Sequence, residues 1–107
     1  MKIAIVDDIS EERTLLRNRL ESQFSRRNVL TDIFEYENGE TFLTSAKECP
    51  FTVAFLDIYM NGFNGIDTAK ELRKSDTDCL LIFTTTSTDH ALEGFQVRAL
   101  HYLVKPY

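Results

Sequence analysis

Short apolar runs alternate with segments of helical periodicity along this chain. Such runs are typical of strands that are buried on both faces, and five of them occur: Lys2–Val6, Val29–Tyr36, Phe51–Leu56, Leu80–Phe83 and His101–Val104. Strands that alternate with helices predict a parallel sheet with helices on both faces. We therefore predict an α/β fold.

Four helices are expected between these strands, because apolar residues recur there at helical spacing. The first is predicted to begin at Ser10, with that side chain as its cap, since Glu11 and Glu12 follow at the positive end of the helix dipole. The other three are expected over residues 40–47, 66–73 and 91–99.

Composition limits the classes of function. A chain of 107 residues with 43% hydrophobic content can build one domain with one core. No apolar stretch approaches the roughly 18 residues of a membrane span, and Lys2–Val6 is too short for a secretory signal, so a cytoplasmic location is expected. Cys49 and Cys79 lack metal-ligand spacing and are expected to be reduced thiols. A net charge of −5 opposes nucleic-acid binding by this domain alone and favours cations or basic partners.

Charged and hydroxyl side chains follow the ends of successive strands. They are Asp7 and Asp8, Asp57, Thr85 and Lys105. Because right-handed crossovers bring the carboxyl ends of parallel strands to one edge of the sheet, these side chains are expected to share one cleft. Three carboxylates there would raise one another's pKa unless a cation joined them. Oxygen ligands of this kind suit Mg²⁺.

One carboxylate of this group is a candidate nucleophile. A divalent cation, an ammonium and a hydroxyl would together stabilise negative charge that arrives on it, as phosphoryl transfer requires. A carboxylate can itself attack phosphorus and form an acyl phosphate. Asp57 is favoured because it ends the central strand of the expected sheet. Each residue alone is more often a turn former, a cap or a solvated side chain, so the prediction depends on their joint occurrence.

The same residues stand in segments that resemble the receiver domain of bacterial two-component response regulators. These segments are Ile5–Asp8, Phe55–Met60 with Gly65 eight residues past Asp57, Ile82–Thr85 and Tyr102–Pro106. Residues 91–106 further resemble receivers attached to LytTR-type DNA-binding domains. The resemblance implies a flavodoxin-like, doubly wound five-stranded sheet of order 2-1-3-4-5.

The resemblance also implies a chemistry and a partner. Asp57 would accept a phosphoryl group from a sensor histidine kinase. The carboxylates of Asp7, Asp8 and Asp57 would hold Mg²⁺, together with the main-chain carbonyl of Tyr59. Lys105 would contact the phosphoryl group. Apart from phosphorylating itself from phosphodonors and slowly losing the group, such a domain is not expected to be an enzyme.

A switch pair is implied as well. Thr85 and Tyr102 would move on phosphorylation and change the face made by the fourth helix and fifth strand, which would control an output domain. Thr85 is chosen over its threonine neighbours by its spacing from Lys105. Periodicity agrees, because Thr84 would share the face of Ile82. DNA would be bound only through the output domain.

Alternative functions remain open. A Mg²⁺-dependent phosphatase with an aspartyl nucleophile resembling the haloacid dehalogenases would carry a second acid two residues after Asp57, where this chain has Tyr59. A pseudo-receiver that only binds partners would usually lack one of the acids or Lys105. His90 and His101 are expected to be ordinary surface residues rather than phosphoryl carriers.

The position of the last residue leads to a further expectation. Residues 1–107 are expected to form a receiver domain that stops at Tyr107, before the fifth helix that a receiver normally has, and to be a fragment of a larger regulator. An apolar patch would then be exposed on one face of the sheet. Self-association or a covering partner chain is predicted.

Overall fold

A computed structural model describes residues 1–60, 64–86 and 96–105 of the chain. Within these ranges five strands form a single sheet: β1 Lys2–Val6, β2 Asp32–Tyr36, β3 Val53–Asp57, β4 Leu80–Thr85 and β5 His101–Val104. All neighbours pair in parallel, in the order β2-β1-β3-β4-β5. The predicted sheet and its strand order are confirmed.

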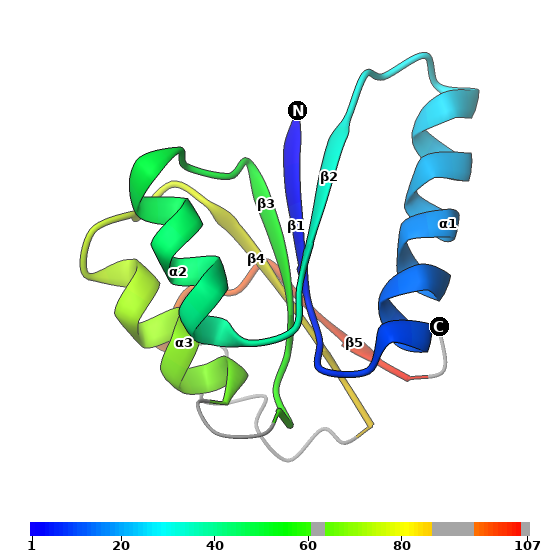
Figure 1. Cartoon of the computed structure of the whole chain (residues 1–107). Coiled ribbons are helices and arrows are strands. Elements are labelled where there is room, and N and C mark those ends of the chain that lie inside the picture. Colours follow the sequence, from blue (N-terminus) through cyan, green and yellow to red (C-terminus); the bar gives the residue numbers. More distant parts are fainter. Residues whose placement is uncertain (61–63, 87–95, 106–107) are drawn as a thin grey trace.

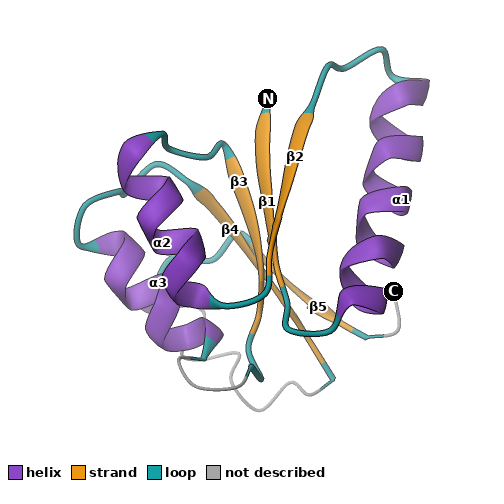
Figure 2. Cartoon of the chain, in the orientation of Figure 1, coloured by secondary structure: helices purple, strands orange, loops and turns teal. Residues whose placement is uncertain are grey.

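Three helices are described, and they cover both faces of the sheet (Figure 1). They are α1 Ser10–Arg26, α2 Gly39–Glu48 and α3 Gly65–Arg73. Figure 2 shows α2 and α3 together on one face and α1 on the other. The helix expected over 91–99 lies mostly outside the described residues. No helix in the described part of the chain is both long enough and apolar enough to span a bilayer.

Successive strand residues supply two separate cores. Ala4, Val6, Ala54 and Leu56 belong to the cluster on the face of α2 and α3. Their neighbours in the same strands, including Ile5 and Phe55, pack with Leu16 of α1 on the opposite face. Because both faces are buried, the central strands read as unbroken apolar runs, which explains why the sequence located them.

The predicted cap of the first helix is wrong. Helix α1 does begin at Ser10, but its cap residue is Ile9, which has no side-chain capping bond. Instead the Ile9 N–H donates to Asp7 Oδ1 at 3.0 Å. An aspartate readily bonds the backbone two residues further on, so Asp7 closes the turn that leads into the helix.

The region of β2 also departs from the prediction. The strand begins at Asp32 rather than at Val29, whose N–H closes a turn by donating to the Phe24 carbonyl at 3.0 Å. Phe34 stands in a run that the sequence predicts to be buried on both faces, but it is 42% exposed. β2 is an edge strand, and the described helices leave Phe34 covered mainly by Phe51 and the ammonium of Lys2.

Candidate functional site

Three acidic side chains meet at the carboxyl edge of the sheet. Ligand oxygens of Asp7, Asp8 and Asp57 all lie within 4.8 Å of one another. Asp7 and Asp57 are only 2% and 4% exposed, whereas Asp8 is partly exposed. The fold thus brings together the three acids that the sequence predicted.

The pairing of two central strands accounts for this meeting. Strands β1 and β3 are neighbours, and Val6 lies opposite Leu56. The next residue of each chain segment is therefore an aspartate, Asp7 or Asp57, and alternation along the strands directs both to the α1 face. The strand register therefore places these two carboxylates where they repel each other.

Lys105 supplies positive charge to this cluster. Its ammonium Nζ lies 2.8 Å from Asp7 Oδ2, 3.8 Å from Asp57 Oδ1 and 3.9 Å from Glu12 Oε2. The Lys105 N–H donates to the Thr85 carbonyl at 2.6 Å, which fixes the residue just beyond β5. Lys105 was predicted here, but its nearest partner is Asp7 rather than Asp57.

Burial dominates the electrostatics of Asp57. It raises the pKa of this carboxyl to about 7, and the charges of Asp7 and Asp8 act in the same direction, while the Lys105 ammonium and a hydrogen bond from the Tyr59 N–H oppose the shift. Without a further cation, Asp57 therefore holds a proton part of the time at neutral pH. A bound cation would lower this pKa and restore the nucleophilic carboxylate.

The carboxylates affect Lys105 in return. Burial alone would lower the pKa of the ammonium, but its hydrogen bond to Asp7 and the charges of Asp57, Asp7 and Glu12 raise it overall. Lys105 is thus firmly cationic. The sequence offered Glu12 only as a helix-start acid, so its approach to Lys105 was missed.

Backbone contacts fix the position of Asp7. Its N–H donates to the Tyr36 carbonyl at 3.0 Å, and its own carbonyl accepts from Arg13 Nη1 at 2.7 Å. Arg13 is held in turn by Glu35 through an ion pair at 3.2 Å. Arg13 is a further supporting residue that sequence reasoning missed, because nothing in the pattern of α1 singles it out.

Gly65 lets α3 begin against the backbone of Asp57. A Cβ at Gly65 would overlap the Asp57 carbonyl and lie 2.9 Å from the Ile58 Cα. The Gly65 N–H donates to the Ile58 carbonyl at 3.0 Å. The glycine at this spacing is therefore needed for close approach, and it helps to set the height of Asp57 at the sheet edge.

Thr85 and Tyr102 lie on adjacent strands. Thr85 is buried at the end of β4, and its parity places it on the face of Phe83 rather than that of Ile82. The Tyr102 ring is half-buried, with its centroid 6.3 Å from that of Phe83. Both residues therefore belong to the α2 and α3 side of β4 and β5.

The remaining predicted positions are less informative. Tyr59 follows β3 by two residues and is 48% exposed. His101 is exposed at the start of β5, as expected. His90 lies outside the described residues.

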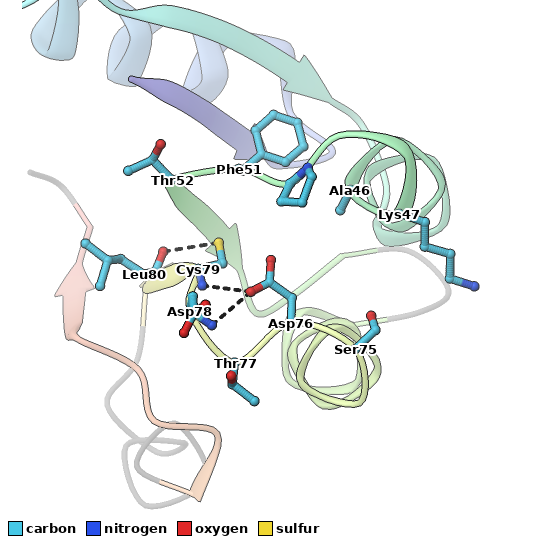
Figure 3. Close-up of a pocket in the computed structure, with 11 residues that line it drawn as sticks. Ala46, Lys47, Phe51, Thr52, Ser75, Asp76, Thr77, Asp78, Cys79 and Leu80 are labelled. Atoms are coloured by element: carbon cyan, nitrogen blue, oxygen red, sulfur yellow. Dashed lines mark hydrogen bonds between the residues drawn. The ribbon is translucent and has the colours of Figure 1, made fainter.

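A hollow of about 730 Å³ occupies the opposite, amino edge of the sheet (Figure 3). The Asp76 carboxylate beside it accepts from the N–H groups of Asp78 and Cys79, at 2.9 and 3.0 Å. Burial, with the nearby charge of Asp76, raises the pKa of the Cys79 thiol to about 11. Cys49 and Cys79 are both free thiols. These groups stabilise a turn, so the hollow lacks the convergent reactive groups of the carboxyl edge.

Comparison with known proteins identifies the family. Residues 3–107 match the model described as the response regulator receiver domain. The chain belongs to the receiver domain family. Among similar proteins, the sensory transduction protein LytT of Oceanobacillus iheyensis is 37% identical over this whole chain, and LytT of Bacillus subtilis is 35% identical. The predicted resemblance to receivers of LytTR-type regulators is confirmed.

This receiver chain spans less than half the length of those relatives, 44% and 43% respectively. Among solved structures, the response regulator TrrA of Thermotoga maritima in complex with Mg²⁺ and BeF is 30% identical, with a TM-score of 0.83 over 99% of this chain and 87% of its own. The chemotaxis protein CheY4 of Vibrio cholerae, 24% identical with a TM-score of 0.85 over 99% of this chain and 87% of its own, shares the fold.

Proposed function

We propose that this receiver domain accepts a phosphoryl group on Asp57 and thereby switches an output domain. The observation that supports it best is the setting of Asp57, which is 4% exposed, lies beside two other carboxylates and has the Lys105 ammonium 3.8 Å away. A buried carboxylate with a raised pKa and a specific cationic partner is typical of a functional site.

The proposed step is a direct transfer. An oxygen of Asp57 attacks the phosphorus of the donor, the bond between phosphorus and the donor atom breaks, and an acyl phosphate remains. The Lys105 ammonium and the Thr85 hydroxyl stabilise charge on the phosphoryl oxygens. The donor is expected to be the phosphohistidine of a sensor kinase, and as a receiver the domain is proposed to work in the cytoplasm.

The donor set fits Mg²⁺. Three carboxylates present oxygens within 4.8 Å of one another, and hard oxygen ligands suit this ion. We assign its ligands as Asp7, Asp8, Asp57 and the main-chain carbonyl of Tyr59. When bound, Mg²⁺ would neutralise charge on Asp57 and on the transferred group.

The switch is proposed to use Thr85 and Tyr102. Movement of Thr85 toward a phosphoryl group would free space on the face that it shares with Phe83 and Tyr102. The change is proposed to pass through Tyr102 to the surface that the expected fourth helix would make with β5. A two-state packing change of this kind can be biased by one new charge-assisted contact. DNA binding is assigned to the output domain, and the expected self-association stays a prediction.

The test is labelling with acetyl phosphate and Mg²⁺, followed by intact mass. We expect addition of one phosphoryl group per chain, with none on Asp57→Asn. Steady release of phosphate from a small phosphoester would instead favour the phosphatase. Mg²⁺ binding without any labelling would favour the pseudo-receiver.

A further inference from the structure

The ammonium of Lys105 faces three carboxylates, and they differ in burial. The side chains of Asp7 and Asp57 are 3% and 6% exposed, and that of Glu12 is 33% exposed. Within the described ranges, these three are the ion-pair partners of Lys105. The positive charge is therefore shared between the sheet edge and the first turn of α1.

Glu12 differs from the other two partners in its role. Asp7 and Asp57 belong to the proposed Mg²⁺ ligand set, so a bound cation would use their charge. Glu12 stands outside that set. When a cation repels the ammonium from Asp7, Glu12 is the partner whose charge stays available to hold it.

The distances allow Glu12 and Asp57 to compete for the ammonium of Lys105. Glu12 Oε2 and Asp57 Oδ1 lie at nearly the same distance from Lys105 Nζ, 3.9 and 3.8 Å. Coulomb attraction at equal distance differs only through the local dielectric. The greater exposure of Glu12 weakens its hold but does not abolish it.

We infer that Glu12 is a positioning residue that competes for the Lys105 ammonium with a phosphoryl group on Asp57. It thereby weakens the binding of the phosphoryl group at the site. The inference rests on the proposed function. It assigns Glu12 an action through Lys105, with no contact to the phosphoryl group itself.

The test compares Glu12→Gln with Glu11→Gln. Both variants remove one negative charge from the same helical turn, but Glu11 is exposed and does not pair with Lys105 among the described residues. With Mg²⁺ saturating, we expect E12Q to bind beryllofluoride about two- to five-fold more tightly than E11Q does, as for a partly exposed charge pair. Isothermal titration calorimetry measures both affinities.

A second readout separates positioning from a structural role. Without beryllofluoride, E12Q is expected to bind Mg²⁺ more weakly than E11Q. In E12Q the Lys105 ammonium has lost its Glu12 partner, so it pairs more strongly with Asp7 and Asp57 and competes more with the metal. A substitution that merely loosened the site would weaken the affinities for both beryllofluoride and Mg²⁺. Competition for Lys105 instead raises the affinity for beryllofluoride and lowers that for Mg²⁺. Glu12→Asp, which keeps the charge but draws it back by one methylene, should shift both in the same directions as E12Q.

Three outcomes decide the matter. Opposite shifts in E12Q and Glu12→Asp support the inference. Equal affinities of E12Q and E11Q, or parallel weakening, overturn it while leaving the proposed function intact. Failure of the wild-type chain to bind beryllofluoride with Mg²⁺ overturns the proposed function and the inference with it.

Discussion

Lys105 and Arg73 are both half-buried cations, and they serve opposite edges of the same sheet. At the amino edge, the Arg73 guanidinium donates to the carbonyls of Val97 and Cys79 at 2.8 Å and to those of Asp76 and Arg98 at 3.3 Å. At the carboxyl edge, Lys105 faces carboxylates. The hydrogen-bond acceptors of Arg73 are neutral carbonyls, whereas the partners of Lys105 are charged carboxylates.

The pKa shifts follow from these surroundings. Burial lowers the pKa of Arg73, whereas the carboxylates raise that of Lys105 against the effect of burial. Carbonyl partners hold a guanidinium in place through five fixed donors, which suits a structural tie between the end of α3 and the segments before β4 and β5. Carboxylates can exchange an ammonium for a metal ion, and the ammonium can exchange a carboxylate for an incoming anion, which suits chemistry.

The largest effect should come from the backbone contact beneath the acidic site. We expect Gly65→Ala to lower the free energy of unfolding by about 3 kcal/mol, because the new methyl group overlaps rigid backbone. Gly39→Ala is the comparison variant, since its methyl group would overlap a buried side chain, that of Thr68, rather than the backbone of Asp57. Urea unfolding measures both.

Gly65→Ala should also weaken Mg²⁺ binding, because Asp57 must move with its carbonyl. If both variants lose the same stability and bind Mg²⁺ like the wild type, the close approach at Gly65 does not position Asp57.

Arg73→Met tests the amino edge. Loss of four carbonyl bonds, with water replacing part of them, should cost about 2 kcal/mol of unfolding free energy. Mg²⁺ affinity at the other edge should stay unchanged, and Arg73→Lys should recover part of the stability. An equal loss of Mg²⁺ affinity would show that the two edges are not independent.

Lys105→Met tests the carboxyl edge, where loss of the cation is expected to strengthen Mg²⁺ binding. Removing the ammonium leaves Asp7 and Asp57 with uncompensated charge, so Mg²⁺ should bind about five- to tenfold more tightly, equivalent to about 1 kcal/mol. Calorimetric titration gives the affinity. Weaker Mg²⁺ binding would mean that Lys105 organises the carboxylates rather than competing with the metal.

Asp57→Asn gives the smallest expected stability change. The folded pKa of about 7 lies above the ordinary value of 3.8, so the proton stabilises the fold and metal-free stability falls as pH rises between them. We expect Asp57→Asn to add about 1 kcal/mol at about pH 8 and less at about pH 5. Thermal unfolding without Mg²⁺ checks this, and a gain that does not grow with pH would exclude a protonated Asp57.

The placement of the acids could be predicted because topology alone decides it. Asp7, Asp57 and Lys105 each follow a strand, and parallel strands end at one edge. Twofold alternation likewise separates Thr85 from Thr84. These relations need only the order of the strands and their pleat.

Side-chain contacts between different helices and strands could not be predicted from the sequence. The sequence shows Glu12 as a helix-start acid, but its approach to Lys105 depends on how α1 leaves the sheet. The Asp7 carboxylate takes both the Ile9 N–H and Lys105, and this displaces the expected cap at Ser10. Such arrangements are fixed by tertiary packing, which local patterns do not encode.

The central claim is that the carboxyl edge is built to receive a phosphoryl group on Asp57. Labelling with acetyl phosphate and Mg²⁺, reduction of the acyl phosphate with borohydride and peptide mass spectrometry would locate the labelled residue. We expect homoserine at position 57 and nowhere else. A label on another residue, or none in the presence of Mg²⁺, would contradict the claim.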